Sequence, residues 1–194
     1  MNKTNHYPLQ FAQHYPEIVS KLEVLPRTGW VQWNIENPET VWEHTLATRE
    51  LAITYKDHLQ LSDDEFHDLL TMIEIHDWPE AVVGDGVILG DEEDIDTLRK
   101  NKQERELEAM KEICEDTIHG DEILKLFQRF EASTNPVAAI AIQIDKLQAV
   151  LKAAEYEKAQ HKQGLADEFF HYTKKTIHHP YLISELTHKT AHLM

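Results

Sequence analysis

The sequence predicts an all-α protein, and three features of its 194 residues support this prediction. Apolar residues recur at helical spacing over several long stretches, and no stretch shows the sustained alternation of apolar and polar residues that marks a strand. Two Ser/Thr-x-x-Glu capping boxes, which begin at Thr40 and Ser62, stand directly before such stretches. Glycine and proline are few, six and seven respectively, as in proteins whose long helices are joined by short connections.

The first half of the chain contains three predicted helices. The first spans 8–24 and is followed by an ordered loop over 25–39 that is rich in Pro, Gly, Asn and Trp. A second helix begins after Thr40, and one of its faces combines apolar residues with His44. The third begins after Ser62 and is expected to end or bend at Pro79. His76 and Asp77 therefore fall at the end of that helix.

The second half begins with an acidic loop over 84–96, followed by predicted helices over 97–118 and 121–130. Pro136 suits the first position of the next helix, whose small and branched apolar residues occur nearly all round. That helix is expected to be central, and Asp145 lies in its middle. A charged helix over 165–176 precedes a histidine-rich tail. We assign no role to its histidines, His178, His179, His188 and His192.

Composition limits the classes of function. Hydrophobic residues make up 41% and charged residues 28%, which is typical of a globular protein, and no repeat or linker divides the chain. We therefore expect a single domain. The formal net charge of −16 argues against a polymeric nucleic acid as partner, because such binding depends on basic side chains that displace counterions. A small phosphorylated substrate is compatible with this charge if the site carries a metal ion and an arginine.

Features that report on the cellular compartment indicate a cytoplasmic protein. The single cysteine, Cys114, cannot form an internal disulfide, which suits a reducing environment. The first ten residues contain no apolar signal core, and no stretch approaches the 18 apolar residues of a membrane span. We expect no membrane partner.

Two imidazoles and two carboxylates lie on faces of three predicted helices that are otherwise suited to burial: His44, His76, Asp77 and Asp145. A buried carboxylate needs a cation or several hydrogen-bond donors. One divalent cation at the junction of the helices would satisfy all four groups. Mixed nitrogen and oxygen ligands suit Mn, Co, Fe, Zn or Ni better than Mg. A histidine on an inner helix face is more often a hydrogen-bonded core residue than a ligand, and Asp145 could pair with an arginine or cap a loop, so spacing alone leaves these alternatives open.

Several motifs resemble those of a known family. HDWPEA (76–81) followed by GD (84–85), with WEH ending at His44 and DK beginning at Asp145, resembles the HD-domain phosphohydrolases. Collinear segments narrow the resemblance to the YfbR-like 5′-deoxynucleotidases and their eukaryotic-type relatives, the HD-domain-containing nucleotidases. These segments are LPRTGW (25–30), NPE (37–39), TVWEH (40–44), HDWPEAVVGD (76–85), 102–110 and IDKLQAVLKAAEYE (144–157).

The resemblance implies a single HD domain over 1–194, an all-α helical bundle with its core at about 25–160 and helical extensions at both ends. It implies a homodimeric, metal-dependent hydrolase that removes phosphate from (deoxy)ribonucleoside 5′-monophosphates. Carried over by position, the divalent metal ion would be bound by His44, His76, Asp77 and Asp145. Glu80 and Asp85 would be catalytic, in proton transfer or in holding a second cation, and Arg27 would orient the substrate phosphate.

The chain also departs from this family. After GD the family usually continues with an apolar residue and Thr-Pro, whereas this chain has Gly-Val-Ile-Leu (86–89) and then a run of acidic residues. Gln148 stands where the family usually has Glu, and Phe127 and Arg129 replace a usual Trp and Glu. Two alternatives follow. The substrate could be a nucleoside triphosphate, a guanosine polyphosphate alarmone or a cyclic nucleotide, or the chain could be a non-catalytic nucleotide sensor.

Overall fold

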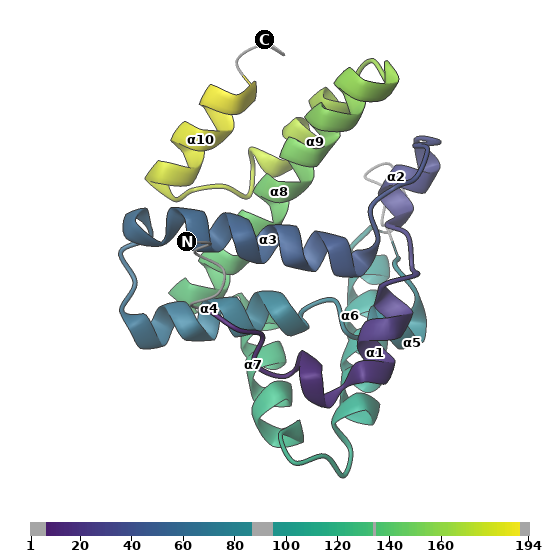
Figure 1. Cartoon of the computed structure of the whole chain (residues 1–194), viewed down its shortest axis with the longest axis vertical. Helices are drawn as coiled ribbons and strands as arrows, with labels where there is room; N and C mark the ends of the chain where they lie inside the picture. Colours follow the sequence, from purple (N-terminus) through teal and green to yellow (C-terminus); the bar gives the residue numbers. More distant parts are fainter. Residues whose placement is uncertain (1–6, 87–94, 134, 191–194) are drawn as a thin grey trace.

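The computed structural model describes residues 7–86, 95–133 and 135–190 and is helical throughout (Figure 1). Within these ranges the only extended pairing is an isolated antiparallel bridge between Pro26 and Thr40. The predicted all-α class is therefore confirmed. The elements in chain order are η2 (Ala12–His14), α1 (Pro16–Leu22), α2 (Thr28–Gln32), α3 (Val41–Tyr55), η3 (Lys56–His58), α4 (Asp63–Ile75), α5 (Glu80–Val83), α6 (Ile95–Cys114), α7 (Gly120–Ala132), α8 (Pro136–Gln160), α9 (Leu165–Thr173) and α10 (Pro180–Thr190).

Local sequence signals account for most helix boundaries. Both capping boxes are formed, with the hydroxyls of Thr40 and Ser62 accepting from the backbone of the glutamate three residues on. The predicted helix over 8–24 is shorter than expected, because it begins at Pro16, a residue suited to the first helical turn. Pro180 likewise begins α10, so most of the histidine-rich tail is helical. The acidic loop at 87–94 and the last residues, with His192, lie outside the described residues.

Helix α8 is the centre of the bundle. It packs against α3, α4, α7, α9 and α10, and buried residues recur along it from Val137 to Tyr156. In Figure 1, α3 and α4 lie side by side across α8, while α9 runs along its C-terminal half. The expectation of a central helix around Asp145 is confirmed. Because α3, α4 and α8 meet in the core, side chains on their facing sides are close together.

The loop that precedes α3 is ordered by backbone hydrogen bonds. Arg27 N–H donates to the Glu39 carbonyl at 3.1 Å, and Val41 N–H donates to the Leu25 carbonyl at 2.9 Å. These bonds close residues 25–41 into a compact turn that contains the short helix α2. The turn brings Arg27 and Glu39 next to each other at the N-terminal end of α3.

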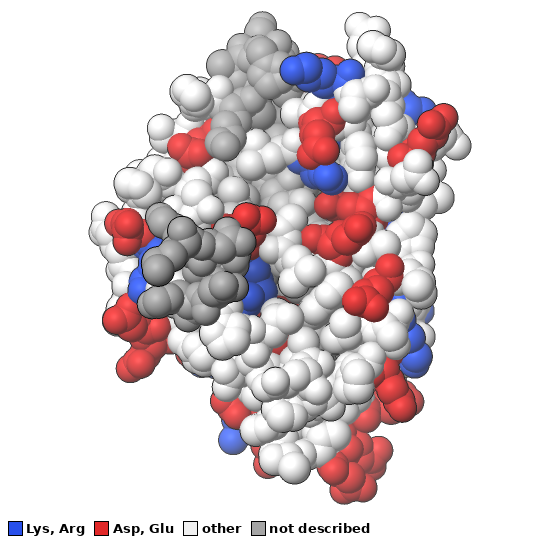
Figure 2. Space-filling model, viewed as in Figure 1, with Lys and Arg blue, Asp and Glu red and all other residues white. Residues whose placement is uncertain are grey.

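Charge is spread unevenly over the surface. On the face shown in Figure 2, acidic side chains occur over much of the visible surface, and basic ones occur singly or in small groups, as the net charge of −16 implies. In the ranges that the structure describes, no helix combines the length and the apolar content that crossing a membrane requires.

Candidate metal centre

Three of the four predicted metal ligands meet at the junction of α3, α4 and α8. His44 lies in the first turns of α3, His76 follows the last residue of α4, and Asp145 lies in the middle of α8. All three are buried, and one ligand atom from each lies within 4.8 Å of those of the other two. This spacing suits three donors around one cation.

His76 is oriented by the helix that it ends. Its Nδ1 lies 2.8 Å from the Ile73 carbonyl oxygen, which can only accept, so Nδ1 carries the proton. In the neutral ring Nε2 then carries the lone pair; this atom is buried and forms no hydrogen bond with the described residues. It lies 3.9 Å from Asp145 Oδ1. A buried lone pair that faces carboxylate oxygens is the arrangement expected of a metal ligand.

Asp145 uses its two oxygens differently. Oδ1 lies 2.7 Å from His44 Nε2, and Oδ2 lies 2.9 Å from Lys146 Nζ. Burial raises the pKa of Asp145, but Lys146, His44 and His76 lower it by more, so this pKa lies well below its usual range. Asp145 is therefore a carboxylate in the protein interior, and it is available to a cation.

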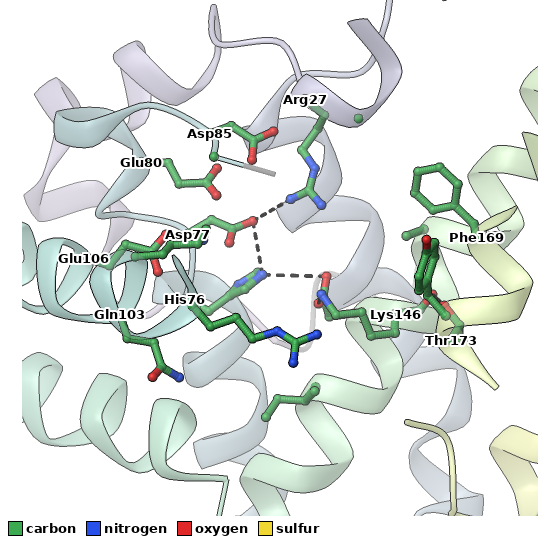
Figure 3. A pocket seen from close by; sticks show the side chains of 18 of the residues that line it. Arg27, His76, Asp77, Glu80, Asp85, Gln103, Glu106, Lys146, Phe169 and Thr173 are labelled. Atoms are coloured by element: carbon green, nitrogen blue, oxygen red, sulfur yellow. Dashed lines mark hydrogen bonds and ion pairs between the residues drawn. The ribbon is translucent and has the colours of Figure 1, made fainter. Parts of the chain in front are cut away.

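Asp77, the fourth predicted ligand, lies at the edge of this group. Its Oδ2 is 3.2 Å from His76 Nε2 and accepts a hydrogen bond from Arg27 Nη1 at 2.9 Å (Figure 3). Burial raises the pKa of Asp77, whereas His76 and Arg27 lower it by more, so the group is ionised. Its role as a ligand stays a prediction.

The donor set fits a divalent cation. Two imidazoles and one buried carboxylate meet, and a second carboxylate is adjacent. Such mixed donors suit first-row transition metals. The buried Nε2 of His76 has no hydrogen-bond partner in the described part of the chain, and a bound cation would provide one.

Arg27 and Asp85 belong to one hydrogen-bonded unit beside this centre. Burial lowers the pKa of Arg27, but the carboxylates of Asp77 and Asp85 raise it by more, so the guanidinium keeps its charge. Asp85 Oδ2 accepts from Thr28 N–H at 2.6 Å, which ties Asp85 to the residue that follows Arg27. Gly84 adopts a φ of 81° in the turn before Asp85, a conformation that favours glycine. The catalytic role predicted for Asp85 stays a prediction, and the structure gives it contacts that hold Arg27 in place.

Glu80 opens the short helix α5 and is 5% exposed. Its Oε2 is buried and has no hydrogen-bond partner in the described part of the chain. Burial and the nearby charges of Asp77 and Asp85 raise the pKa of Glu80 to about 10. A carboxyl group that holds its proton at neutral pH beside a cluster of metal-type donors is suited to proton transfer.

A cavity of about 520 Å³ opens over these groups (Figure 3). Helices α6 and α9 form facing walls of the cavity. The sequence did not place them at the site, because segment 102–110 of α6 entered the family resemblance without a predicted role and α9 carries no motif. Beyond the residues already described, the lining includes Arg99, Lys102, Gln103, Glu106, Phe130, Glu131, Lys146, Glu168, Phe169, Tyr172 and Thr173. Lys102 is paired with Glu106, and Lys146 with Asp145. The cavity thus gathers several cations within an acidic protein.

A buried chain of hydrogen bonds lies behind His44. Trp30 Nε1 donates to Glu39 Oε1 at 3.0 Å, and Gln148 Nε2 donates to Glu39 Oε2 at 3.2 Å. Gln148 Oε1 lies 2.6 Å from His44 Nδ1. Burial raises the pKa of Glu39, while His44, Trp30 and Arg27 lower it by more, so Glu39 is a carboxylate. We refer to Trp30, Glu39, Gln148 and His44 as the His44 chain.

Comparison with known proteins agrees with this geometry. A family model for the HD domain matches residues 19–185. The chain belongs to the HD-domain family. The resemblance inferred from the motifs is thereby confirmed, and with it the assignment to a family of metal-dependent phosphohydrolases.

Among HD-domain proteins, the human 5′-deoxynucleotidase HDDC2 is 32% identical over 92% of this chain and 83% of its own length. The 5′-deoxynucleotidase hdd1 of Schizosaccharomyces pombe is 28% identical over 84% of this chain and 81% of its own length. A conserved hypothetical protein of Pyrococcus furiosus has the same fold, with a TM-score of 0.70 and 22% identity over 90% of this chain and 96% of its own.

Proposed function

We propose that this HD-domain protein is a metal-dependent 5′-deoxynucleotidase, which hydrolyses the phosphomonoester of deoxyribonucleoside 5′-monophosphates. The observation that carries the proposal is the meeting of three buried metal-type donors with Arg27 and Glu80 at one cavity. The human and fission-yeast relatives, both 5′-deoxynucleotidases, support the same substrate class. We include Asp77 as the fourth metal ligand, because its Oδ2 is 3.2 Å from His76 Nε2.

The phosphate end of the substrate would lie between Arg27 and the metal centre. Arg27 presents a planar fork that can bind two phosphoryl oxygens at once, and Asp77 holds it at 2.9 Å. A divalent cation held by His44, His76, Asp77 and Asp145 would neutralise charge on the phosphoryl oxygens and would make a water molecule acidic enough to act as the nucleophile at neutral pH. The protein contributes the positions of these charges, which are set before the substrate arrives.

Glu80 would move the proton. Phosphomonoester hydrolysis requires a proton at the leaving 5′ oxygen, and Glu80 is a protonated, unpartnered carboxyl that lines the cavity. Its pKa of about 10 keeps that proton available at neutral pH in the protein without metal. Asp77 lies between Glu80 and Arg27 in Figure 3, so the three groups face one region of the cavity.

The nucleobase of the substrate would lie toward α9. Trp30 is 2% exposed, stacks on Phe169 at 4.5 Å and donates its N–H to Glu39, so its ring is used in packing. Tyr172 also lines the cavity and is 51% exposed, which leaves its ring free to stack on a nucleobase. Tyr172→Ala should therefore raise KM for nucleotides several-fold and leave KM for a minimal phosphomonoester such as p-nitrophenyl phosphate unchanged.

A phosphate-release panel tests the function. Purified protein with Mn²⁺ or Co²⁺ is incubated with deoxyribonucleoside and ribonucleoside 5′-monophosphates, deoxynucleoside triphosphates, a guanosine polyphosphate and a cyclic nucleotide. We expect turnover of the monophosphates, with the deoxy forms preferred. Turnover restricted to the longer or cyclic substrates would contradict the proposal, and binding without turnover of any substrate would favour the sensor. The expected homodimer stays a prediction, which light scattering on the same preparation checks.

A further inference from the structure

In the His44 chain, the donor and the acceptor of each hydrogen bond are fixed, because the groups at the Trp30 end cannot exchange these roles. The indole N–H of Trp30 can only donate, and the Glu39 carboxylate can only accept. Because Glu39 Oε2 accepts, the group of Gln148 that faces it at 3.2 Å must be the amide NH₂. The amide oxygen of Gln148 then faces His44 Nδ1 at 2.6 Å, so Nδ1 must carry a proton.

The consequence for His44 concerns the nitrogen on the opposite side of the ring. Without metal, Nε2 donates a hydrogen bond to Asp145 Oδ1 at 2.7 Å on the side of the metal centre. A metal ion displaces the proton of the nitrogen that it binds, so a proton held on Nδ1 leaves the lone pair of Nε2 to the metal. We propose that Glu39 and Gln148 are positioning residues, which orient His44 and hold its proton on Nδ1 so that Nε2 binds the metal ion. This inference rests on the proposed function only in taking His44 as a metal ligand.

Burial allows the His44 chain only one arrangement of hydrogen-bond donors and acceptors. His44 is fully buried, and Glu39 and Gln148 are each 6% exposed, so water does not offer these groups alternative partners. The backbone of Glu39 is held as well, since its N–H donates to the Tyr156 hydroxyl at 2.7 Å and its carbonyl accepts from Arg27 N–H. The side chains are therefore kept in register. Glu39 Oε1 lies 3.7 Å from His44 Nδ1, beyond hydrogen-bond distance, so Gln148 is the direct acceptor of the Nδ1 proton.

Glu39→Gln tests the direction of the chain without changing its shape. The amide oxygen of the new side chain must face Trp30 N–H, so its NH₂ group must face Gln148. Gln148 would have to turn its own oxygen toward residue 39 and its NH₂ group toward His44 Nδ1. His44 would then lose its acceptor, and the proton would be favoured on Nε2, where it blocks the metal. We expect affinity for Zn²⁺ or Co²⁺ to fall about 10- to 100-fold, as for other partners of metal-bound histidines.

The double variant E39Q/Q148E should reverse that loss. A glutamate at 148 accepts from His44 Nδ1–H and also from the NH₂ group at 39, while the oxygen at 39 still accepts from Trp30. Every donor again meets an acceptor, although the amide and the carboxylate have exchanged places. We expect the double variant to bind metal at least about tenfold more tightly than Glu39→Gln alone. A purely steric role for the two positions predicts no such recovery.

Gln148→Met tests whether this glutamine supports metal binding, and Gln143→Met is its matched control. Both glutamines lie on α8 and are buried to a similar degree, 7% and 6% exposed. Gln143, however, accepts from the backbone N–H groups of His178 and His179, away from the metal centre. We expect Gln148→Met to weaken metal binding about 10- to 100-fold and Gln143→Met to leave the metal affinity unchanged, whatever its effect on stability.

The measurements are made on folded protein, verified by circular dichroism. Metal affinity is obtained by competition with a chromophoric chelator, starting from metal-free protein. In ¹H–¹⁵N spectra of zinc-loaded protein with ¹⁵N-labelled histidine rings, we expect a slowly exchanging Nδ1–H signal from His44 in the unmodified protein and in E39Q/Q148E. We expect this signal to be lost or to exchange rapidly in Gln148→Met.

Separate outcomes distinguish this inference from the proposed function. Unchanged metal affinity in Glu39→Gln and Gln148→Met, or no recovery in the double variant, would overturn the positioning role even if nucleotides are hydrolysed. The expected pattern of affinities without turnover of any nucleotide would support the positioning role and remove the proposed function. A protein that binds neither Zn²⁺ nor Co²⁺ would overturn the positioning role directly.

Discussion

The base and the mouth of the cavity hold their polar groups in different ways. At the base, His44, His76 and Asp145 are buried, and each is oriented by a specific hydrogen bond or ion pair. At the mouth, which we define by Arg99, Lys146 and Tyr172, the side chains are roughly half exposed or more. Buried polar groups without alternative partners are fixed before any ligand binds, whereas exposed ones adjust to it. Metal binding and substrate choice should therefore be separable by mutation.

The largest expected effect follows from a substitution at the base of the cavity, where the metal ligands lie. Asp145→Asn removes the negative charge that faces His44 and His76, so metal binding and turnover should be lost together, with activity down at least about a thousandfold. Metal content of the purified variant and phosphate release are the two measurements. Asp64→Asn, an exposed aspartate in the first turn of α4, is the control and should behave as the unmodified protein. Full metal occupancy in Asp145→Asn would show that the base does not hold the cation.

A substitution at Glu80 should affect proton transfer without affecting metal binding. Glu80→Gln keeps the shape and the neutral charge of the protonated acid but cannot transfer a proton, so kcat should fall about 10²- to 10⁴-fold. Metal content should be unchanged, because the three clustered donors do not include Glu80. Glu108→Gln, an exposed glutamate on α6, is the control. Turnover close to that of the unmodified protein would remove Glu80 from the mechanism.

Substitution of Arg27 tests the part of the cavity that lies between its base and its mouth. Arg27→Lys keeps the positive charge but loses the planar fork, and a charge-assisted hydrogen bond of about 1.5–3 kcal/mol corresponds to a fall of about 10- to 100-fold in kcat/KM. Most of this fall should appear as a higher KM, while metal content stays the same. Arg105→Lys, at an exposed position on α6, serves as control. Loss of metal in Arg27→Lys would mean that this arginine belongs to the base of the cavity.

A last prediction concerns the pH dependence of stability in the metal-free protein and involves no change in activity. The folded-state pKa of Glu80 is raised to about 10, above its value of about 4.5 in the unfolded chain, so folding takes up a proton between these two pH values. Glu80 therefore contributes stability that is complete below pH ~4.5 and is lost progressively as pH rises toward 10. Because glutamine does not titrate, the melting temperature of Glu80→Gln should rise relative to that of the unmodified protein between pH 5 and pH 9. A difference that does not change with pH would contradict the raised pKa.

Local signals in the sequence were sufficient for most helices and for the residue types at the metal centre. Thr40 and Ser62 mark helix starts because a capping box is a contact between residues three apart. His76 and Asp77 fall at a helix end because Pro79 follows them. The walls of the cavity could not be predicted in this way. Tyr172 lies on a helix with no distinctive motif, and Lys102 begins a family-like segment without a predicted role. Both reach the cavity only because α9 packs on α8 and α6 packs on α5 and α7.

The His44 chain shows the same limit more sharply. The NPE segment that ends at Glu39 and the unusual Gln148 were visible in the sequence, but nothing in either segment indicated that they touch. They are 109 residues apart, and His44 and Asp145 are 101 apart. By itself the sequence determined the helices, the family and the set of candidate ligands, since these depend on residue type and short-range spacing. Only the tertiary structure decided which donors and acceptors meet, because the packing of α3 and α4 against α8 brings distant residues together and removes water as an alternative partner.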